Sequence, residues 1–317
     1  MTDLKRLLDD SRPLELLRRD KEEGALSHAY ALFGDDPVAM EWILRRMAEI
    51  IVCKKGGCGE CPACLALNGG VHPDVRFYEG ALTVKDVEEL IEDSAKFSVE
   101  GGVKIYAVFA LDKTGAPAQN KLLKTVEEPP EGVIFLFGVT KPSAVAETLK
   151  SRCKKLNYNG VEQGRLQEAL RAEYGDGPAV RSAAAYAGGS ISRALALAAD
   201  ESFAVEADNV VALLGAMKKS SDVPGETARA AQDKEHVKRR LDVMEIVLDM
   251  VGKYKRGLTD GGGGIAGIAE DFNYAALADA EYLVNDCRKR LESNCAPSAV
   301  SDTLLFGILE VKYKCRR

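Results

Sequence analysis

The chain has 317 residues, of which 46% are hydrophobic and 29% charged, with a formal net charge of −6 and a pI of about 5.4. This composition is typical of a globular protein with two or three domains, and the acidic balance argues against a uniformly basic, DNA-coating surface. No apolar run reaches the roughly 18–20 residues that a membrane span requires. No apolar segment follows Met1–Arg6 as it would in a signal peptide. We therefore expect a cytoplasmic protein without membrane contact.

Strand and helix patterns alternate through the first half of the chain. Helical periodicity marks four segments: 11–24, 38–53, 83–97 and a segment that ends before Pro129. Short apolar runs predict strands between them: 29–33, 75–78, 103–109 and 133–137. Thr83 and Asp86 have the spacing of a capping box at the start of the third helix. Such alternation predicts an α/β fold with a parallel sheet covered on both faces.

The second half of the chain reads as helical. Residues 158–200 are alanine-rich with a break at Gly188-Gly189, and long amphipathic helices follow, interrupted by a glycine loop at 261–264. We divide the chain into an α/β domain (1–156), a small helical domain (157–205) and a helical domain (206–317). One helix of the last domain carries more apolar residues than one buried face needs, so we expect it also to contact a neighbouring subunit. These residues are Leu241, Met244, Ile246, Val247, Leu248 and Met250.

Four of the eight cysteines lie within twelve residues, in the pattern Cys53-x4-Cys58-x2-Cys61-x2-Cys64. Zinc prefers four soft ligands in a tetrahedron, and the interspersed glycines permit the positive φ angles of a tight knuckle. Four thiolates would give the site a net charge of −2, which lysines 54 and 55 can offset. The alternatives are four free thiols, a redox pair, or a DNA-reading finger, but no basic recognition helix adjoins the cluster. We predict a structural zinc knuckle.

The most distinctive motifs lie between Lys104 and Cys153. An apolar strand is followed by the sequence LLKTVEEPP at 122–130, a second apolar strand with Thr140 after it, and Ser151-Arg152-Cys153. In this order and spacing the motifs resemble those of the clamp-loader subunits of bacterial DNA polymerase III, which are AAA+ proteins. The resemblance implies an AAA+ sheet with an inserted zinc knuckle at 53–64, a helical lid and a helical collar. It also implies that Arg152, with Ser151, serves as an arginine finger directed at ATP on the next subunit.

The resemblance also bears on the metal ligands and on two further positions. In that family the first gap of the cysteine cluster is usually longer, which leaves His72 as an alternative to Cys53, although His72-Pro73-Asp74 also suits a turn into the next strand. Thr140 and Arg193 fall at the two sensor positions of the family. Without bound nucleotide in the same chain, we expect Arg193 to have a structural or interface role and Thr140 to be vestigial.

The segment that matches the family's nucleotide-binding loop is degenerate. A P-loop, GxxxxGK[ST], binds phosphate through backbone N–H groups, a lysine and a hydroxyl. Here only Gly34 remains, with Met40 in place of the lysine and Trp42 shortly after it. Three nearby acidic residues would repel a triphosphate: Asp35, Asp36 and Glu41. The acidic pair after the strand at 103–109 is also broken, because Lys113 follows Asp112.

Within this family, the subunit that lacks ATP binding but keeps the arginine is delta prime, and the resemblance is to that subunit. It implies a non-hydrolysing stator of the clamp loader, without ATP of its own and without independent ATPase activity, inside the DNA polymerase III holoenzyme. The implied partners are gamma/tau and delta subunits in a hetero-oligomeric ring, the sliding clamp, and primer–template DNA reached through the complex. Two alternatives stay open: an ATP-hydrolysing gamma/tau-like motor and a stand-alone zinc-dependent nucleic-acid-binding protein.

Overall fold

The computed structural model describes residues 3–100, 102–200, 202–223, 234–259 and 261–315. The chain forms two compact units. The N-terminal unit comprises residues 1–169 and 189–192, and the C-terminal unit comprises residues 170–188 and 193–317. The division into three domains at residues 156 and 205 stays a prediction.

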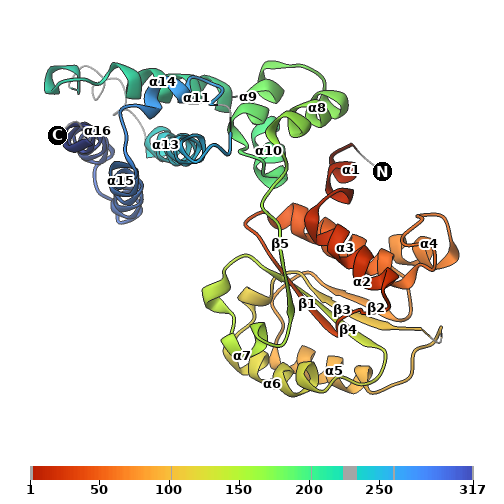
Figure 1. The fold of residues 1–317 in the computed structure, drawn as a ribbon. Helices are drawn as coiled ribbons and strands as arrows, with labels where there is room; N and C mark the ends of the chain where they lie inside the picture. Colours follow the sequence, from red (N-terminus) through yellow and green to blue (C-terminus); the bar gives the residue numbers. More distant parts are fainter. Residues whose placement is uncertain (1–2, 101, 201, 224–233, 260, 316–317) are drawn as a thin grey trace. The chain divides into compact units, whose positions relative to one another are not determined.

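A five-stranded sheet organises the N-terminal unit (Figure 1). Its strands are β1 (Ala29–Phe33), β2 (Val75–Tyr78), β3 (Lys104–Val108), β4 (Val133–Val139) and β5 (Lys154–Asn157). Their order is β2-β3-β4-β1-β5, and every neighbouring pair is parallel. The apolar sequence VIFLFGV of β4 is buried along its whole length at the centre of the sheet, because both of its faces are covered. The predicted α/β fold with a parallel sheet is confirmed.

Helices cover both faces of this sheet. One face carries α1 (Asp3–Asp9), α2 (Arg12–Glu22) and α3 (Pro37–Val52), and the other carries α5 (Val84–Ser94), α6 (Ala116–Glu127) and α7 (Glu147–Lys150) (Figure 1). Three further short elements lie between them in the chain: α4 (Pro62–Asn68), η1 (Leu111–Lys113) and η2 (Pro142–Ala144). The predicted capping box is present, since Thr83 and Asp86 each bind the other's backbone N–H. The sequence reasoning did not foresee α1, α4 or β5.

The chain beyond β5 is helical, as predicted. Its elements are α8 (Gln163–Tyr174), α9 (Pro178–Tyr186), α10 (Ile191–Ala198), α11 (Phe203–Ala216), η3 (Ser220–Asp222), α13 (Lys234–Lys255), α14 (Ile265–Ala269), α15 (Tyr274–Glu292) and α16 (Pro297–Cys315). In the described part of the chain, no helix combines the length and the apolarity that crossing a bilayer requires.

Helix α13 is the centre of the C-terminal unit. It contacts α11, α14, α15 and α16, and Leu241, Met244, Val247, Leu248 and Met250 are all fully buried in the core of this unit. The excess of apolar residues on this helix is therefore accounted for within the chain. Ile246, the sixth residue of the set, is half-buried against the same core, and the expected contact with a neighbouring subunit stays a prediction.

Candidate functional site

The four clustered cysteines converge on one point beside the C-terminal end of α3. Cys53 is the residue after the last turn of α3, Cys61 is the N-cap of α4 and Cys64 lies in α4. The four sulfur atoms all lie within 4.8 Å of one another. Sγ of Cys53 is 3.6 Å from Sγ of Cys58 and 3.7 Å from Sγ of Cys61. A tetrahedral zinc with Zn–S bonds of about 2.3 Å requires S···S separations of about 3.8 Å, so the cluster fits a four-coordinate zinc ion.

The local backbone adopts the conformation that a knuckle needs. Gly56, Gly57 and Gly59 have φ angles of +73°, +88° and +78°, which residues with a Cβ rarely adopt. His72, the alternative ligand, is absent from the cluster. It lies in the turn before β2, where its Nδ1 accepts a hydrogen bond from the backbone N–H of Asp74 at 3.2 Å. The described structure therefore assembles Cys53 with the other three cysteines.

The charges of the thiols show what a bound cation would contribute to the cluster. Burial opposes ionisation of Cys53, but backbone N–H groups, including those of Cys58 and Lys55, outweigh it and lower the pKa of Cys53 to about 6. Burial raises the pKa of Cys64 to about 12, and the neighbouring Cys53 adds to this shift. The cluster can thus hold one thiolate by itself, whereas four adjacent thiolates need a bound metal ion to offset their charge.

A lysine from a distant helix supports the knuckle. The ammonium of Lys21, on α2, donates hydrogen bonds to the backbone carbonyls of Ile50 and Cys53 and lies 3.3 Å from the carbonyl of Ile51. Burial lowers the pKa of Lys21, while Cys53 and Cys64 oppose this shift. Lys21 therefore binds carbonyls at the end of α3 and brings a positive charge to the thiols. The Cys53 carbonyl also accepts a hydrogen bond from the N–H of Gly56. From the sequence, lysines 54 and 55 were expected to offset the charge of the thiolates, and both are exposed.

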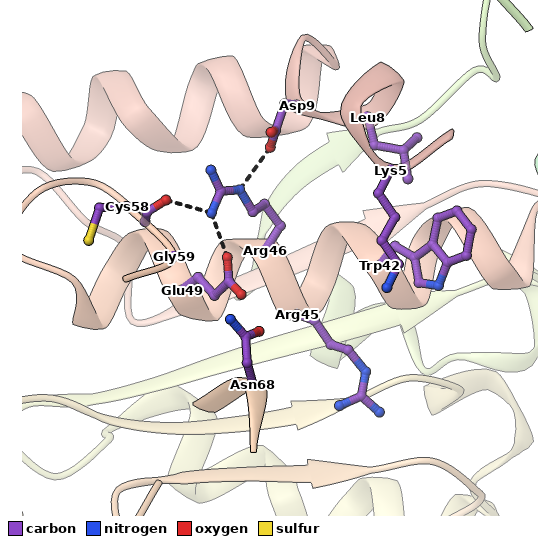
Figure 2. A pocket seen from close by; sticks show the side chains of 11 residues that line it. Lys5, Leu8, Asp9, Trp42, Arg45, Arg46, Glu49, Cys58, Gly59 and Asn68 are labelled. Atoms are coloured by element: carbon purple, nitrogen blue, oxygen red, sulfur yellow. Dashed lines mark hydrogen bonds and ion pairs between the residues drawn. The ribbon is translucent and has the colours of Figure 1, made fainter. Parts of the chain in front are cut away.

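Arg46 ties the knuckle to two helices (Figure 2). Its guanidinium binds Asp9 of α1 at 2.7 Å, Glu49 of α3 at 2.5 Å and the carbonyl of Gly57 at 2.7 Å. The same three elements enclose a pocket of about 460 Å³, lined in part by Trp42, whose ring lies 5.3 Å from Nζ of Lys5. The tryptophan that follows the degenerate nucleotide loop therefore belongs to this pocket.

The degenerate loop itself is packed against protein. Met40, at the position of the P-loop lysine, is 1% exposed. A Cβ added to Gly34 would lie 3.0 Å from the carbonyl oxygen of Tyr158 and 3.2 Å from Sδ of Met40, so these residues fill the space beside the loop. Asp36 is fully buried and caps α3 by accepting a hydrogen bond from the N–H of Ala39. The Asp36 carboxylate is thus bound within the protein. From the sequence we had expected only that its charge would repel a triphosphate.

The remnant of the acidic pair is also bound within the chain. Asp112, in η1, accepts hydrogen bonds from the backbone N–H of Thr140 at 3.1 Å and from its hydroxyl at 2.8 Å. Lys113 is exposed. Asp112 therefore connects the ends of two neighbouring strands through Thr140.

Arg152 lies just beyond α7, where Ser151 is the C-cap. Its guanidinium donates to Oε1 of Glu127 at 2.7 Å and to the carbonyl of Thr148 at 2.8 Å. The side chains of Arg152 and Glu127 are 31% and 53% exposed. The hydrogen bond with Glu127 raises the pKa of Arg152, and the same contact lowers the pKa of Glu127. Glu127 is the last residue of α6, which ends at the EEPP sequence as predicted.

Two other residues from the family motifs, Cys153 and Arg193, interact with other parts of the chain. Burial raises the pKa of the Cys153 thiol to about 12, which agrees with a small buried side chain and not with a nucleophile. Arg193 donates to the carboxylate of Asp249 at 2.5 Å within the C-terminal unit.

Comparisons with known proteins agree with the motifs. The family described as "DNA polymerase III, delta subunit" matches residues 10–162. A Bacillus subtilis DNA polymerase III subunit delta' is 26% identical over 64% of this chain and 63% of its own length. The delta' subunit of Pseudomonas aeruginosa is 32% identical over 40% and 42%, and a Haemophilus influenzae tau/gamma subunit is 31% identical over 47% and 22%. The alignments thus span less than two thirds of each of these relatives.

Among solved structures, a DNA polymerase III gamma subunit-related protein from Thermotoga maritima aligns with a TM-score of 0.48 and 14% identity. That alignment covers 95% of this chain and 99% of the other.

The fold and the site define a parallel α/β protein with a four-cysteine knuckle, a degenerate nucleotide loop and a helical C-terminal region. The family match over residues 10–162 and the relatives show that this part of the chain is similar to the delta' and tau/gamma subunits of DNA polymerase III.

Proposed function

We propose that the chain is a non-hydrolysing stator of the DNA polymerase III clamp loader, which supplies Arg152 to ATP bound by a neighbouring subunit. One observation carries this proposal: the chain keeps an accessible arginine while its own nucleotide loop is filled. Met40 is buried where a phosphate-binding lysine would stand, whereas the Arg152 side chain is 31% exposed. A chain with this combination can act on a nucleotide only in trans.

The surroundings of Arg152 suit such a role. A guanidinium presents a planar fork of donors that matches phosphate oxygens, and fingers supplied in trans stabilise the charge that develops during phosphoryl transfer. In the isolated chain Glu127 occupies part of this fork. In the complex, a multiply charged triphosphate replaces the single carboxylate of Glu127 as the partner of Arg152.

The same proposal includes the cofactor and the partners. Zinc in the Cys53–Cys64 knuckle is structural, the partners are gamma/tau and delta subunits, and the assembled ring acts on the sliding clamp at primer–template DNA in the cytoplasm. The helical region from residue 206 onward joins the ring. In support of this surface, α15 exposes 74% of Tyr282 and α16 exposes 45% of Phe306, and large exposed aromatic side chains favour protein contacts.

The test is reconstitution of the complete loader with Arg152→Ala. We expect DNA- and clamp-stimulated ATPase to fall while the complex still assembles, and we expect Arg152→Lys to restore little because a point charge lacks the bidentate fork. Arg19→Ala, which removes an exposed arginine paired with Glu23, is the matched control. An unchanged ATPase rate in a fully assembled Arg152→Ala complex would refute the finger role.

A further inference from the structure

The carboxylate of Asp36 has more partners than a helix cap requires. Besides the N–H of Ala39 at 3.1 Å, it accepts hydrogen bonds from the backbone N–H of Ile191 at 2.5 Å, from the N–H of Ser192 at 3.1 Å and from the Ser192 hydroxyl. Ile191 and Ser192 are 155 and 156 residues further along the chain, and all these residues belong to the N-terminal unit. An ordinary N-cap would account only for the bond from Ala39.

The donors around Asp36 are those that bind phosphate in other proteins. They are the backbone N–H groups at the start of α3 and at the start of α10, two helix ends with positive partial charge. The hydroxyl of Ser192 completes the arrangement, because it accepts a hydrogen bond from the N–H of Val38 at 3.0 Å while it donates to Asp36. A fully buried carboxylate therefore uses the donors that an external anion would need.

We propose that Asp36 is an internal ligand that takes the place of a nucleotide phosphate at the degenerate loop and permanently fastens residues 189–192 to it. This inference rests on the nucleotide-free role proposed above. If the anion were a bound nucleotide, residues 189–192 would be held only while nucleotide was present. Because the carboxylate belongs to the chain, the contact is independent of nucleotide concentration. Tyr158 and Met40 close the loop from beside Gly34, which leaves the Asp36 carboxylate as the anion of this site.

Backbone hydrogen exchange in the full-length protein tests the proposal. In Asp36→Ala, the amides of Ile191 and Ser192 lose their acceptor, and we expect them to exchange at least about tenfold faster than in the wild type. Asp35→Ala removes the neighbouring carboxylate, which is exposed, and should exchange like the wild type. Wild-type protection of both amides in Asp36→Ala would overturn the proposal.

Rescue by a small anion separates an anion site from an ordinary packing contact. Inorganic phosphate or formate should restore protection of the two amides in Asp36→Ala in a saturable way, whereas chloride at the same ionic strength should not. Lost protection that neither anion restores would show that the carboxylate does not stand in for a phosphate.

A second variant and a separate readout keep the result interpretable. If Asp36→Ala fails to fold, Asp36→Asn replaces it, because asparagine keeps the shape of the side chain and one acceptor. We expect the amides of Ile191 and Ser192 to exchange faster in this variant than in the wild type. Unchanged exchange would again overturn the proposal. The exchange is measured on the isolated chain, whereas the Arg152 finger is tested in the assembled loader. Failure of the finger role would therefore leave the Asp36 result unaffected.

Discussion

Replacing Lys21 by methionine should weaken zinc binding, although Lys21 lies 32 residues before the first cysteine of the cluster. Methionine keeps most of the length and apolar surface of the lysine side chain and removes only its charge and its donors. The ammonium donates to the carbonyls of Ile50 and Cys53, which end α3 at the first zinc ligand. Without it, the Cys53 carbonyl keeps only the hydrogen bond from the N–H of Gly56, and the start of the knuckle loses its contact with α2.

The size of the effect follows from these contacts. A hydrogen bond from a charged donor contributes about 1.5–3 kcal/mol when buried, but Lys21 is only half-buried, so solvent screening reduces each of the two bonds to about 0.5–1 kcal/mol. A total of about 1–2 kcal/mol corresponds to a zinc dissociation constant about 5- to 30-fold higher. The positive charge contributes most in the zinc-bound state, in which four thiolates and Zn²⁺ together carry a net charge of −2.

Competition with a chromophoric chelator measures the zinc affinity directly. Lys54→Met is the matched control, because Lys54 is next to Cys53 in sequence but exposed, and it should change the affinity little. If Lys54→Met weakened zinc binding as much as Lys21→Met, the effect would come from net charge alone. The argument from the carbonyl contacts would then be refuted.

Three further predictions concern the metal, the nucleotide and the assembly. Protein purified without chelator should contain about one zinc per chain. The variant Cys61→Ser should lose zinc and thermal stability, since structural zinc contributes directly to folding. Full zinc content and full stability of Cys61→Ser would contradict the ligand assignment. Calorimetry of the isolated chain with Mg·ATP should show no micromolar binding because Met40 fills the lysine position, and saturable binding would favour the gamma/tau-like motor. Phe306→Glu should weaken binding to the partner subunits, as measured by gel filtration. Phe97→Glu is the control, at a side chain of the N-terminal unit that is 99% exposed, and it should bind like the wild type. Equal behaviour of the two variants would argue against α16 as a contact surface.

Strands of the sheet could be predicted where the buried residues form a continuous apolar run in the sequence. β1 and β2 occupy the predicted ranges 29–33 and 75–78, since each is an apolar run that ends at or near a turn. β5 was missed because its sequence, KKLN, has no such pattern and it pairs only with β1 at the sheet edge. Its Lys154 is instead bound by Asp20, a buried carboxylate of α2, at 2.6 Å. That contact joins residues 134 positions apart, which local periodicity cannot reveal.

In the candidate site, too, contacts within one short segment could be predicted and contacts between distant segments could not. The cysteine knuckle was predictable because all four thiols lie within one short segment, so their spacing and the glycines limit how the segment can fold. Lys21 and the bonds between Asp36 and Ser192 were not predictable, because each joins segments that only the folded chain brings together. The charge of Asp36 was visible in the sequence and predicted only repulsion of a triphosphate, since Ile191 and Ser192, which donate hydrogen bonds to it, lie more than 150 residues away.

The contact between Glu127 and Arg152 gives a physical reason for the joint occurrence of two motifs. Glu127 belongs to LLKTVEEPP and ends α6, and Arg152 follows α7, 25 residues later. Because α6 and α7 are in contact, the two chain ends meet and the carboxylate holds the guanidinium at 2.7 Å. The prolines that end α6 therefore also fix where Glu127 lies. The first motif therefore positions the arginine of the second. If Arg152 acts as the proposed finger, it must exchange Glu127 for a phosphate in the assembled complex.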